Sequence, residues 1–236
     1  MSVAHLARAL LDEPRWVETR SMLLAEDAAV TGLTGDHRTF VARALSRPLV
    51  AVVGHPEALF LADAVAQAGA DVTVLCADEY GARAERALPG WRRIGAQILA
   101  WPGGVPLPAA PPATEARLLE PDEVAALGHL PRALHRDLLA ASADSLVAGA
   151  FSGGAPVSFC HAAALTETLW DIAVTTLDGY RRRGLATRAV QCLMAEMRED
   201  GWWPVWGAED DNPASLAFAR RLGFTDSGRL ALFRKE

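Results

Sequence analysis

The residues with the most distinctive chemistry lie in a short basic segment that runs from Arg181 to Ala186. Three consecutive arginines precede Gly184, and a predicted helix over 185–199 begins there without a gap. The first turn of a helix leaves amide N–H groups unpaired, and the helix dipole adds partial positive charge at that end. Gly184 would let the backbone approach a ligand closely, and the small Ala186 would avoid crowding it. The segment therefore predicts a cradle for a pyrophosphate group, while a solvated basic turn closed by glycine is the alternative.

The elements that must position this segment follow from the hydrophobic pattern of the second half of the chain. Its predicted strands cover residues 116–119, 145–151, 156–164, 168–175 and 204–208. Its predicted helices cover residues 121–127, 131–141, 185–199 and 212–222. Three of the strands follow one another through tight connections, so an antiparallel meander is expected to lead into the basic segment.

The first half of the chain is organised differently. A strand over 49–53, a helix over 57–68 and a strand over 71–76 predict a strand–helix–strand unit. Further helices are expected over 4–11 and 37–45. The turn after the first strand has one glycine where a dinucleotide-binding turn uses three, so a nucleotide site there has little support.

A proline- and glycine-rich stretch over residues 101–112 cannot sustain a helix or a central strand. It predicts a linker, and the expected domains are residues 1–112 and residues 113–236. The first would be a small α/β domain.

Composition and charge narrow the function classes. The chain has 236 residues, of which 51% are hydrophobic and 22% charged, as in ordinary folded proteins. The formal net charge of -6 and the single dense basic run argue against a general nucleic-acid binder. Without a secretory signal or an apolar run of about 18 residues, a cytoplasmic protein with no membrane partner is expected. Three widely spaced cysteines indicate neither a disulfide framework nor a metal site.

Two separated motifs resemble the GNAT family of acetyl-CoA-dependent N-acetyltransferases, over roughly residues 114–236. The segment from Tyr180 to Ala186 is similar to its pyrophosphate loop, and the segment from Asn212 to Phe224 is similar to the part beside the pantetheine arm. The longer string that begins at Pro204 is similar to a bacterial subgroup with an extra N-terminal domain. The resemblance implies an α/β (α+β) architecture with the GNAT acyl-CoA N-acyltransferase fold in the C-terminal half. The smaller N-terminal α/β domain would wall the acceptor cleft and could be a diverged GNAT-like half.

The resemblance also implies which residues bind the cosubstrate acetyl-CoA. Backbone groups near the end of one strand would contact the pantetheine, and the amides of the basic segment would hold the pyrophosphate. The expected cofactor-binding residues are Val174, Thr176, Arg181, Arg182, Arg183, Gly184, Leu185, Ala186, Asn212 and Ser215. For Asn212 a plain helix cap is the alternative.

Direct attack of an amine on a thioester needs a base and an acid. The candidate bases are Glu167, Asp171 and Glu209, and for each the alternative is a solvated or paired carboxylate. Burial could raise the pKa of Asp171 towards a useful value. Many family members carry a tyrosine acid at the position that is Ala219 here, so Ser215 or an ordered water would have to substitute.

The expected function is acetyl transfer to an amine of a small molecule or peptide. A non-catalytic acyl-CoA-binding or regulatory protein is the alternative. The identity of the acceptor stays open, and so does the oligomeric state, including a homodimer.

Overall fold

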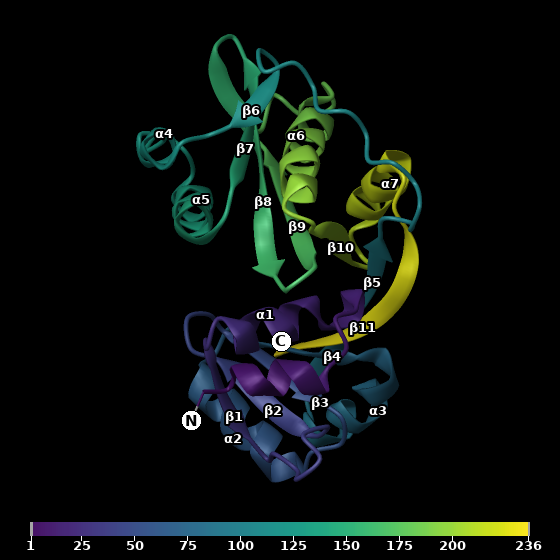
Figure 1. Ribbon diagram of the computed structural model, residues 1–236. Helices are drawn as coiled ribbons and strands as arrows, with labels where there is room; N and C mark the ends of the chain where they lie inside the picture. Colours follow the sequence, from purple (N-terminus) through teal and green to yellow (C-terminus); the bar gives the residue numbers. More distant parts are fainter. Residues whose placement is uncertain (1, 236) are drawn as a thin grey trace. The chain divides into compact units, whose positions relative to one another are not determined.

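The computed structural model describes residues 2–235, and the chain divides into two compact units (Figure 1). The first unit comprises residues 1–100, 165–169 and 206–236, and the second comprises residues 101–164 and 170–205. This division differs from the predicted ranges 1–112 and 113–236. The last segment belongs to the first unit because strand β11 (Thr225–Lys235) pairs with β4 (Thr73–Ala77) and β5 (Trp91–Ala100).

The first unit is a mixed sheet with helices. Its other strands are β1 Ala28–Thr31, β2 Phe40–Ala44 and β3 Leu49–Val53. Its helical elements are the 3₁₀ helices η1 Ala4–Ala9 and η2 Pro14–Trp16, and the α-helices α1 Val17–Leu24, α2 Ala58–Ala68, α3 Asp78–Ala87 and α7 Pro213–Leu222. The strand order is β1-β2-β3-β4-β11-β5, and β3 and β4 are parallel because α2 connects them as a crossover.

The helix predicted over 37–45 is wrong, because residues 40–44 form β2. This strand pairs antiparallel with both β1 and β3. Phe40, Val41 and Ala42 are all fully buried, as expected for a strand covered on both faces. A short apolar run of this kind has no periodicity that separates a strand from a helix.

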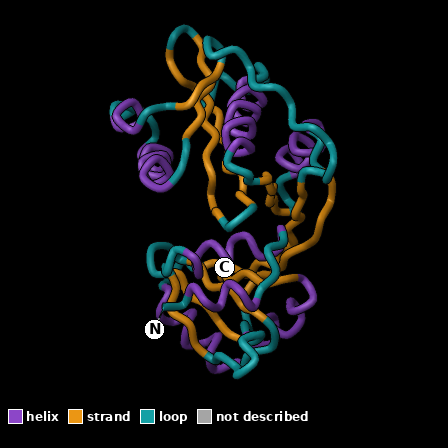
Figure 2. The backbone as a smooth tube through the Cα atoms, viewed as in Figure 1, coloured by secondary structure: helices purple, strands orange, loops and turns teal. Residues whose placement is uncertain are grey.

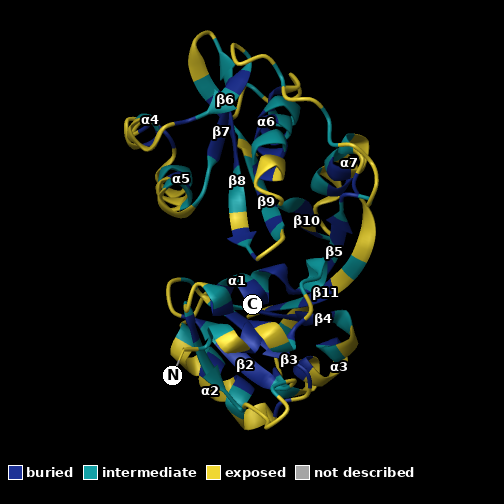
Figure 3. Ribbon diagram, viewed as in Figure 1, coloured by how far each residue is buried: buried dark blue, intermediate teal, exposed yellow. Residues whose placement is uncertain are grey.

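The core of the first unit lies between the sheet and helices α2 and α3. Val52 of β3, Val74 of β4, Phe233 of β11 and Leu61 of α2 belong to one buried cluster. The strands are largely buried, whereas the outward sides of α2 and α3 are exposed (Figure 3). The predicted strand–helix–strand unit is therefore confirmed as β3–α2–β4.

The second unit is an antiparallel sheet with its own helices. Its strands are β6 Ala116–Leu118, β7 Val147–Ser152, β8 Ala155–Leu165 and β9 Leu169–Thr176, in the order β9-β8-β7-β6. Its helices are α4 Pro121–Ala125, α5 Arg132–Asp144 and α6 Leu185–Glu199. The chain passes back to the first unit within β10 (Trp203–Glu209).

The sequence pattern predicted these elements well. Gly153 and Gly154 both have positive φ, at 61° and 83°, which suits the tight turn of the β7–β8 hairpin. Helix α6 has the predicted bounds. The proline-rich stretch forms an irregular connection over residues 101–115 (Figure 2). Within residues 2–235 no helix combines the length and apolarity that crossing a membrane requires.

Candidate functional site

The loop between β9 and α6 contains the basic segment and belongs to the second unit. Three of its residues have left-handed backbone conformations, with φ of 84° at Gly179, 62° at Arg182 and 77° at Gly184. Left-handed residues in such a turn direct neighbouring amide N–H groups to one side and form a concavity suited to an anion. For Arg182 this conformation is unusual, since side chains disfavour it.

The first turn of α6 leaves its amides available. Gly184 is the N-cap residue, and the first helical hydrogen bond runs from the Arg188 amide to the Gly184 carbonyl at 3.2 Å. The amides of residues 185–187 donate no hydrogen bond to any part of the chain that the structure describes. The first turn contains no acidic side chain, so the positive end of the helix dipole is not neutralised locally.

The arginines of the loop are exposed and differ in their partners. Arg181 forms an ion pair of 3.1 Å with Asp178, and its side chain is 68% exposed. The guanidinium of Arg183 lies 5.5 Å from the centroid of the Tyr180 ring. Arg182 takes part in none of the ion pairs formed among residues 2–235. The loop therefore carries excess positive charge beside the free amides.

A buried serine that was not among the predicted site residues, Ser158, fixes the strand end before the loop. The Ser158 hydroxyl lies 2.7 Å from the Thr176 hydroxyl and donates to the Thr175 carbonyl at 3.2 Å. The Leu177 amide donates to the Val157 carbonyl at 2.9 Å. The signal in the sequence was a single serine within an apolar strand, where its hydroxyl must find a partner.

Asn212 and Ser215 lie at the start of α7, in the first unit. The Asn212 side-chain oxygen accepts a hydrogen bond from the Ser215 amide at 3.1 Å, so Asn212 caps the helix. Trp206 donates its indole N–H to the Ser215 hydroxyl at 2.9 Å. The Trp206 ring is 2% exposed and packs edge-on against Phe218 and Phe224. The capping role that the sequence left open is therefore present.

Two of the candidate bases are paired with arginine. Both carboxylate oxygens of Glu209 accept hydrogen bonds from Arg234, at 2.5 and 3.0 Å. Glu167 accepts a hydrogen bond of 2.5 Å from Arg20, whose side chain is 5% exposed. Since arginine already occupies these oxygens, the paired-carboxylate alternative describes both residues.

The acidic turn between β10 and α7 is also engaged. Arg229 donates to Asp210 at 2.5 Å and Gln97 donates to it at 3.1 Å. The hydrogen bond from Arg229 holds the pKa of Asp210 below its ordinary value. The interaction with Arg229 therefore favours the ionised form of Asp210.

Asp171 lies in β9 between Trp170 and Ile172, which are 0% and 7% exposed. Because side chains alternate along a strand, Asp171 faces away from these two residues. Ala219, which stands where the related tyrosine acid would be, is fully buried in α7.

The predicted site residues fall into two groups. Asp171, Val174, Thr176 and the loop residues 181–186 belong to the second unit. Glu167, Glu209, Asn212 and Ser215 belong to the first.

The chemistry of the loop fits the pyrophosphate of coenzyme A. A phosphate group is bound well by free amides at a helix start, by left-handed residues in the preceding turn and by exposed arginines. The residues that would hold it are 182–186, with charge from Arg181 and Arg183. Within residues 2–235 no cluster of His, Cys, Asp and Glu side chains is arranged to hold a metal ion.

One known protein family matches this part of the chain. A sequence model of the GNAT acetyltransferase family matches residues 148–233, which include the loop, α6 and α7. No curated protein sequence matches the chain.

Solved structures resemble the chain over nearly its whole length. A GCN5-related N-acetyltransferase-like protein from Streptococcus suis 89/1591 has a TM-score of 0.70 at 16% identity, covering 100% of this chain and 98% of its own. A GCN5-related N-acetyltransferase from Kribbella flavida has a TM-score of 0.64 at 14% identity, covering 98% and 94%. A GCN5-related N-acetyltransferase from Sphaerobacter thermophilus has a TM-score of 0.59 at 18% identity, covering 98% of this chain and 91% of its own. The predicted fold class is confirmed, and the likeness of fold includes the first half of the chain.

Proposed function

We propose that this chain, identified as a GNAT acetyltransferase by its residues 148–233, transfers the acetyl group of acetyl-CoA to the nitrogen of an amine. The acceptor would be a small molecule or a peptide. The loop between β9 and α6 carries the proposal, because three free amides follow the left-handed Gly184 within a basic turn. Acetyl-CoA would supply the activated thioester.

The chain's own contribution begins with binding. The amides of residues 182–186 would hold the pyrophosphate through hydrogen bonds, and Arg181 and Arg183 would add charge. The backbone of Val174 and Thr176 would bind the pantetheine. Ser158 supports this arrangement because its hydroxyl fixes Thr176 at the end of β9.

For proton removal from the amine we propose Asp171 as the first candidate. Glu167 and Glu209 stay candidates, and each accepts a hydrogen bond from arginine. Asp171 lies in the same strand as Val174 and Thr176. Ser215 stays a candidate for protonating the leaving thiolate, although its hydroxyl accepts a hydrogen bond from Trp206.

A second function has its own support. A non-catalytic acyl-CoA-binding protein would need the loop but no acid, and the position of the related tyrosine acid is a buried alanine. The expected cytoplasmic location and the oligomeric state stay predictions under either function.

Release of free CoA thiol from acetyl-CoA separates the two functions. We would measure it with a panel of primary amines that includes polyamines, aminoglycosides, amino acids and peptide N-termini. An enzyme should give amine-dependent release that Asp171→Asn reduces at every pH. Binding of acetyl-CoA without release for any amine would support the non-catalytic function.

A further inference from the structure

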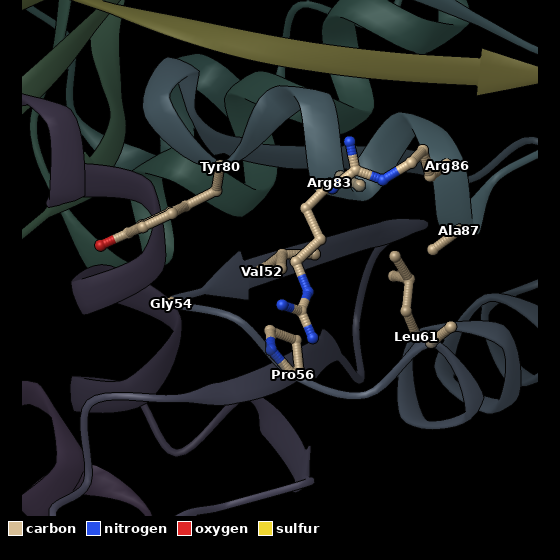
Figure 4. Close-up of a pocket in the computed structure, with 10 residues that line it drawn as sticks. Val52, Gly54, Pro56, Leu61, Tyr80, Arg83, Arg86 and Ala87 are labelled. Atoms are coloured by element: carbon tan, nitrogen blue, oxygen red, sulfur yellow. The ribbon is translucent and has the colours of Figure 1, made fainter.

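A cavity of about 230 Å³ opens in the first unit, beside the carboxyl end of β3. Its lining comes from the end of β3 and the following turn, from α2 and from α3 (Figure 4). In sheets with parallel strands, ligands bind at the carboxyl ends of the strands. The cavity lies in such a place, since β3 and β4 are parallel neighbours.

The turn after β3 has a fixed shape. Gly54 is buried and has a φ of 65°, and a side chain there would collide with the backbone of Arg38 and with Thr39. Only glycine fits both the conformation and the space. The turn thus keeps Pro56 and Ala58 in place along one side of the cavity.

Helix α3 supplies the opposite side. Tyr80, Arg83, Ala84 and Ala87 line the cavity at a spacing of three and four residues, so they share one helix face. Arg83 extends across towards Pro56, whereas the Tyr80 hydroxyl points away from the arginines (Figure 4). Arg86 adds a second guanidinium at the rim.

The acidic side chains of α3 have ion-pair partners, whereas two of its arginines have none within the described chain. Its acidic side chains are paired elsewhere, because Asp78 and Glu85 bind Arg93 and Glu79 binds Arg15. Arg83 and Arg86, by contrast, take part in no ion pair or hydrogen bond within the described chain. Two unpaired cations at one cavity create a local positive potential.

The floor of the cavity is apolar. Val52, Leu61 and Ala84 are at most 3% exposed. The volume is below the roughly 300–1,000 Å³ of drug-sized ligand sites, so the cavity can enclose only a small group. A cavity of about 150 Å³ accommodates benzene, so this one has space for roughly nine non-hydrogen atoms.

We propose that this cavity binds a small organic carboxylate. The Arg83 guanidinium would bind the carboxylate through paired hydrogen bonds, with additional charge from Arg86. The hydrocarbon part would lie on Val52, Leu61 and Ala84. This site goes beyond acetyl transfer, because all its residues lie between 52 and 87, outside the matched range 148–233.

Benzoate is a suitable probe, since it combines a carboxylate with an apolar ring of the required size. We would titrate the full-length protein with benzoate, without acetyl-CoA, and follow backbone amide NMR signals of residues 54–58 and 80–87. Benzamide tests the charge, because it has nearly the same shape and is neutral. Inorganic phosphate tests whether an anion alone is enough.

Three variants complete the test. Arg83→Gln removes the main cation from an exposed position, and Ala58→Phe fills the cavity without changing any charge. Arg8→Gln is the matched control, since Arg8 is exposed in the same unit and does not line the cavity. Circular dichroism would confirm that each variant is folded.

We expect saturable benzoate binding to the wild type and to Arg8→Gln. Arg83→Gln should bind benzoate about tenfold or more weakly than the wild type does, because a charge-assisted hydrogen bond is lost. The wild type should bind benzamide more weakly than benzoate by a similar factor, for the same reason. Ala58→Phe should also lose binding. Absence of benzoate binding to the wild type would overturn the proposal. So would a wild type that binds benzamide or phosphate as tightly as benzoate, or an Arg83→Gln variant that binds benzoate as tightly as the wild type. Because acetyl-CoA is absent, none of these outcomes depends on the acetyltransferase proposal.

Discussion

Replacing Arg20 with methionine should destabilise the first unit strongly. Arg20 is 4% exposed and donates to the carbonyl oxygens of Ala7 and Leu10. It also binds Glu167 at 2.5 Å, and its Nε lies 3.4 Å from an Asp12 oxygen. One buried guanidinium thus holds the N-terminal segment and the turn between β8 and β9.

The size of the effect follows from these contacts. Removing one partner of a buried ionic network typically costs about 3–5 kcal/mol, because the remaining groups lose their hydrogen bonds. For a chain of this length that loss lowers the unfolding midpoint by about 6–20 °C. Glu167→Gln should cost about 1 kcal/mol or less, since the Glu167 side chain is 49% exposed and solvent screens the pair.

Thermal unfolding followed by circular dichroism measures both variants, with the CoA-release assay run in parallel. Arg20→Met should melt far below the wild type, while Glu167→Gln should melt close to it and retain turnover. An Arg20→Met protein that melts within about 2 °C of the wild type would refute the anchoring role. Loss of turnover in a fully stable Glu167→Gln would instead make Glu167 a catalytic residue.

Further predictions concern other parts of the chain. Arg117 lowers the pKa of Glu123 to about 2, so this pair should stabilise the fold fully above about pH 4.5 and lose its effect as the pH falls towards 2. Arg117→Gln should return the Glu123 pKa towards 4.5 in a carboxyl-carbon NMR titration. Ala219→Tyr should not create an acid but should destabilise the fold by about 1–3 kcal/mol in urea unfolding, because the site is fully buried. All three cysteines are buried with raised thiol pKa values, so a disulfide reagent at pH 8 should react with them only after unfolding.

The local features of the candidate site could be predicted from the sequence. Gly184 next to three arginines and a regular apolar helix pattern predicts both the bounds of α6 and its free amides. Asn212 followed by proline predicts the N-cap of α7. These features depend on interactions between residues close in the chain, which a sequence pattern records directly.

Long-range pairing could not be predicted in the same way. Strand β11 lies between β4 and β5, about 150 and 135 residues earlier in the chain, and no local pattern encodes that placement. The arginine partners of Glu167 and Glu209 likewise come from Arg20 and Arg234. From the sequence alone, Glu167 and Glu209 could be predicted as bases. In the folded chain each of them is paired with an arginine.

The most direct test of the account is acetyl-CoA binding by calorimetry to the wild type, Gly184→Asn and Gly184→Asp. No atom lies within 4 Å of a side-chain carbon added at Gly184, and asparagine tolerates its left-handed φ of 77°. The Asp and Asn variants therefore differ mainly in charge. At a separation of about 6 Å each phosphate charge is repelled by about 0.7 kcal/mol in water and about 3 kcal/mol near a protein surface.

The account predicts that the wild type binds acetyl-CoA and that Gly184→Asn retains most of this affinity. Gly184→Asp should bind at least about tenfold more weakly than Gly184→Asn. A wild type that does not bind, or an Asp variant that binds as tightly as the Asn variant, would contradict the assignment of the pyrophosphate to this loop.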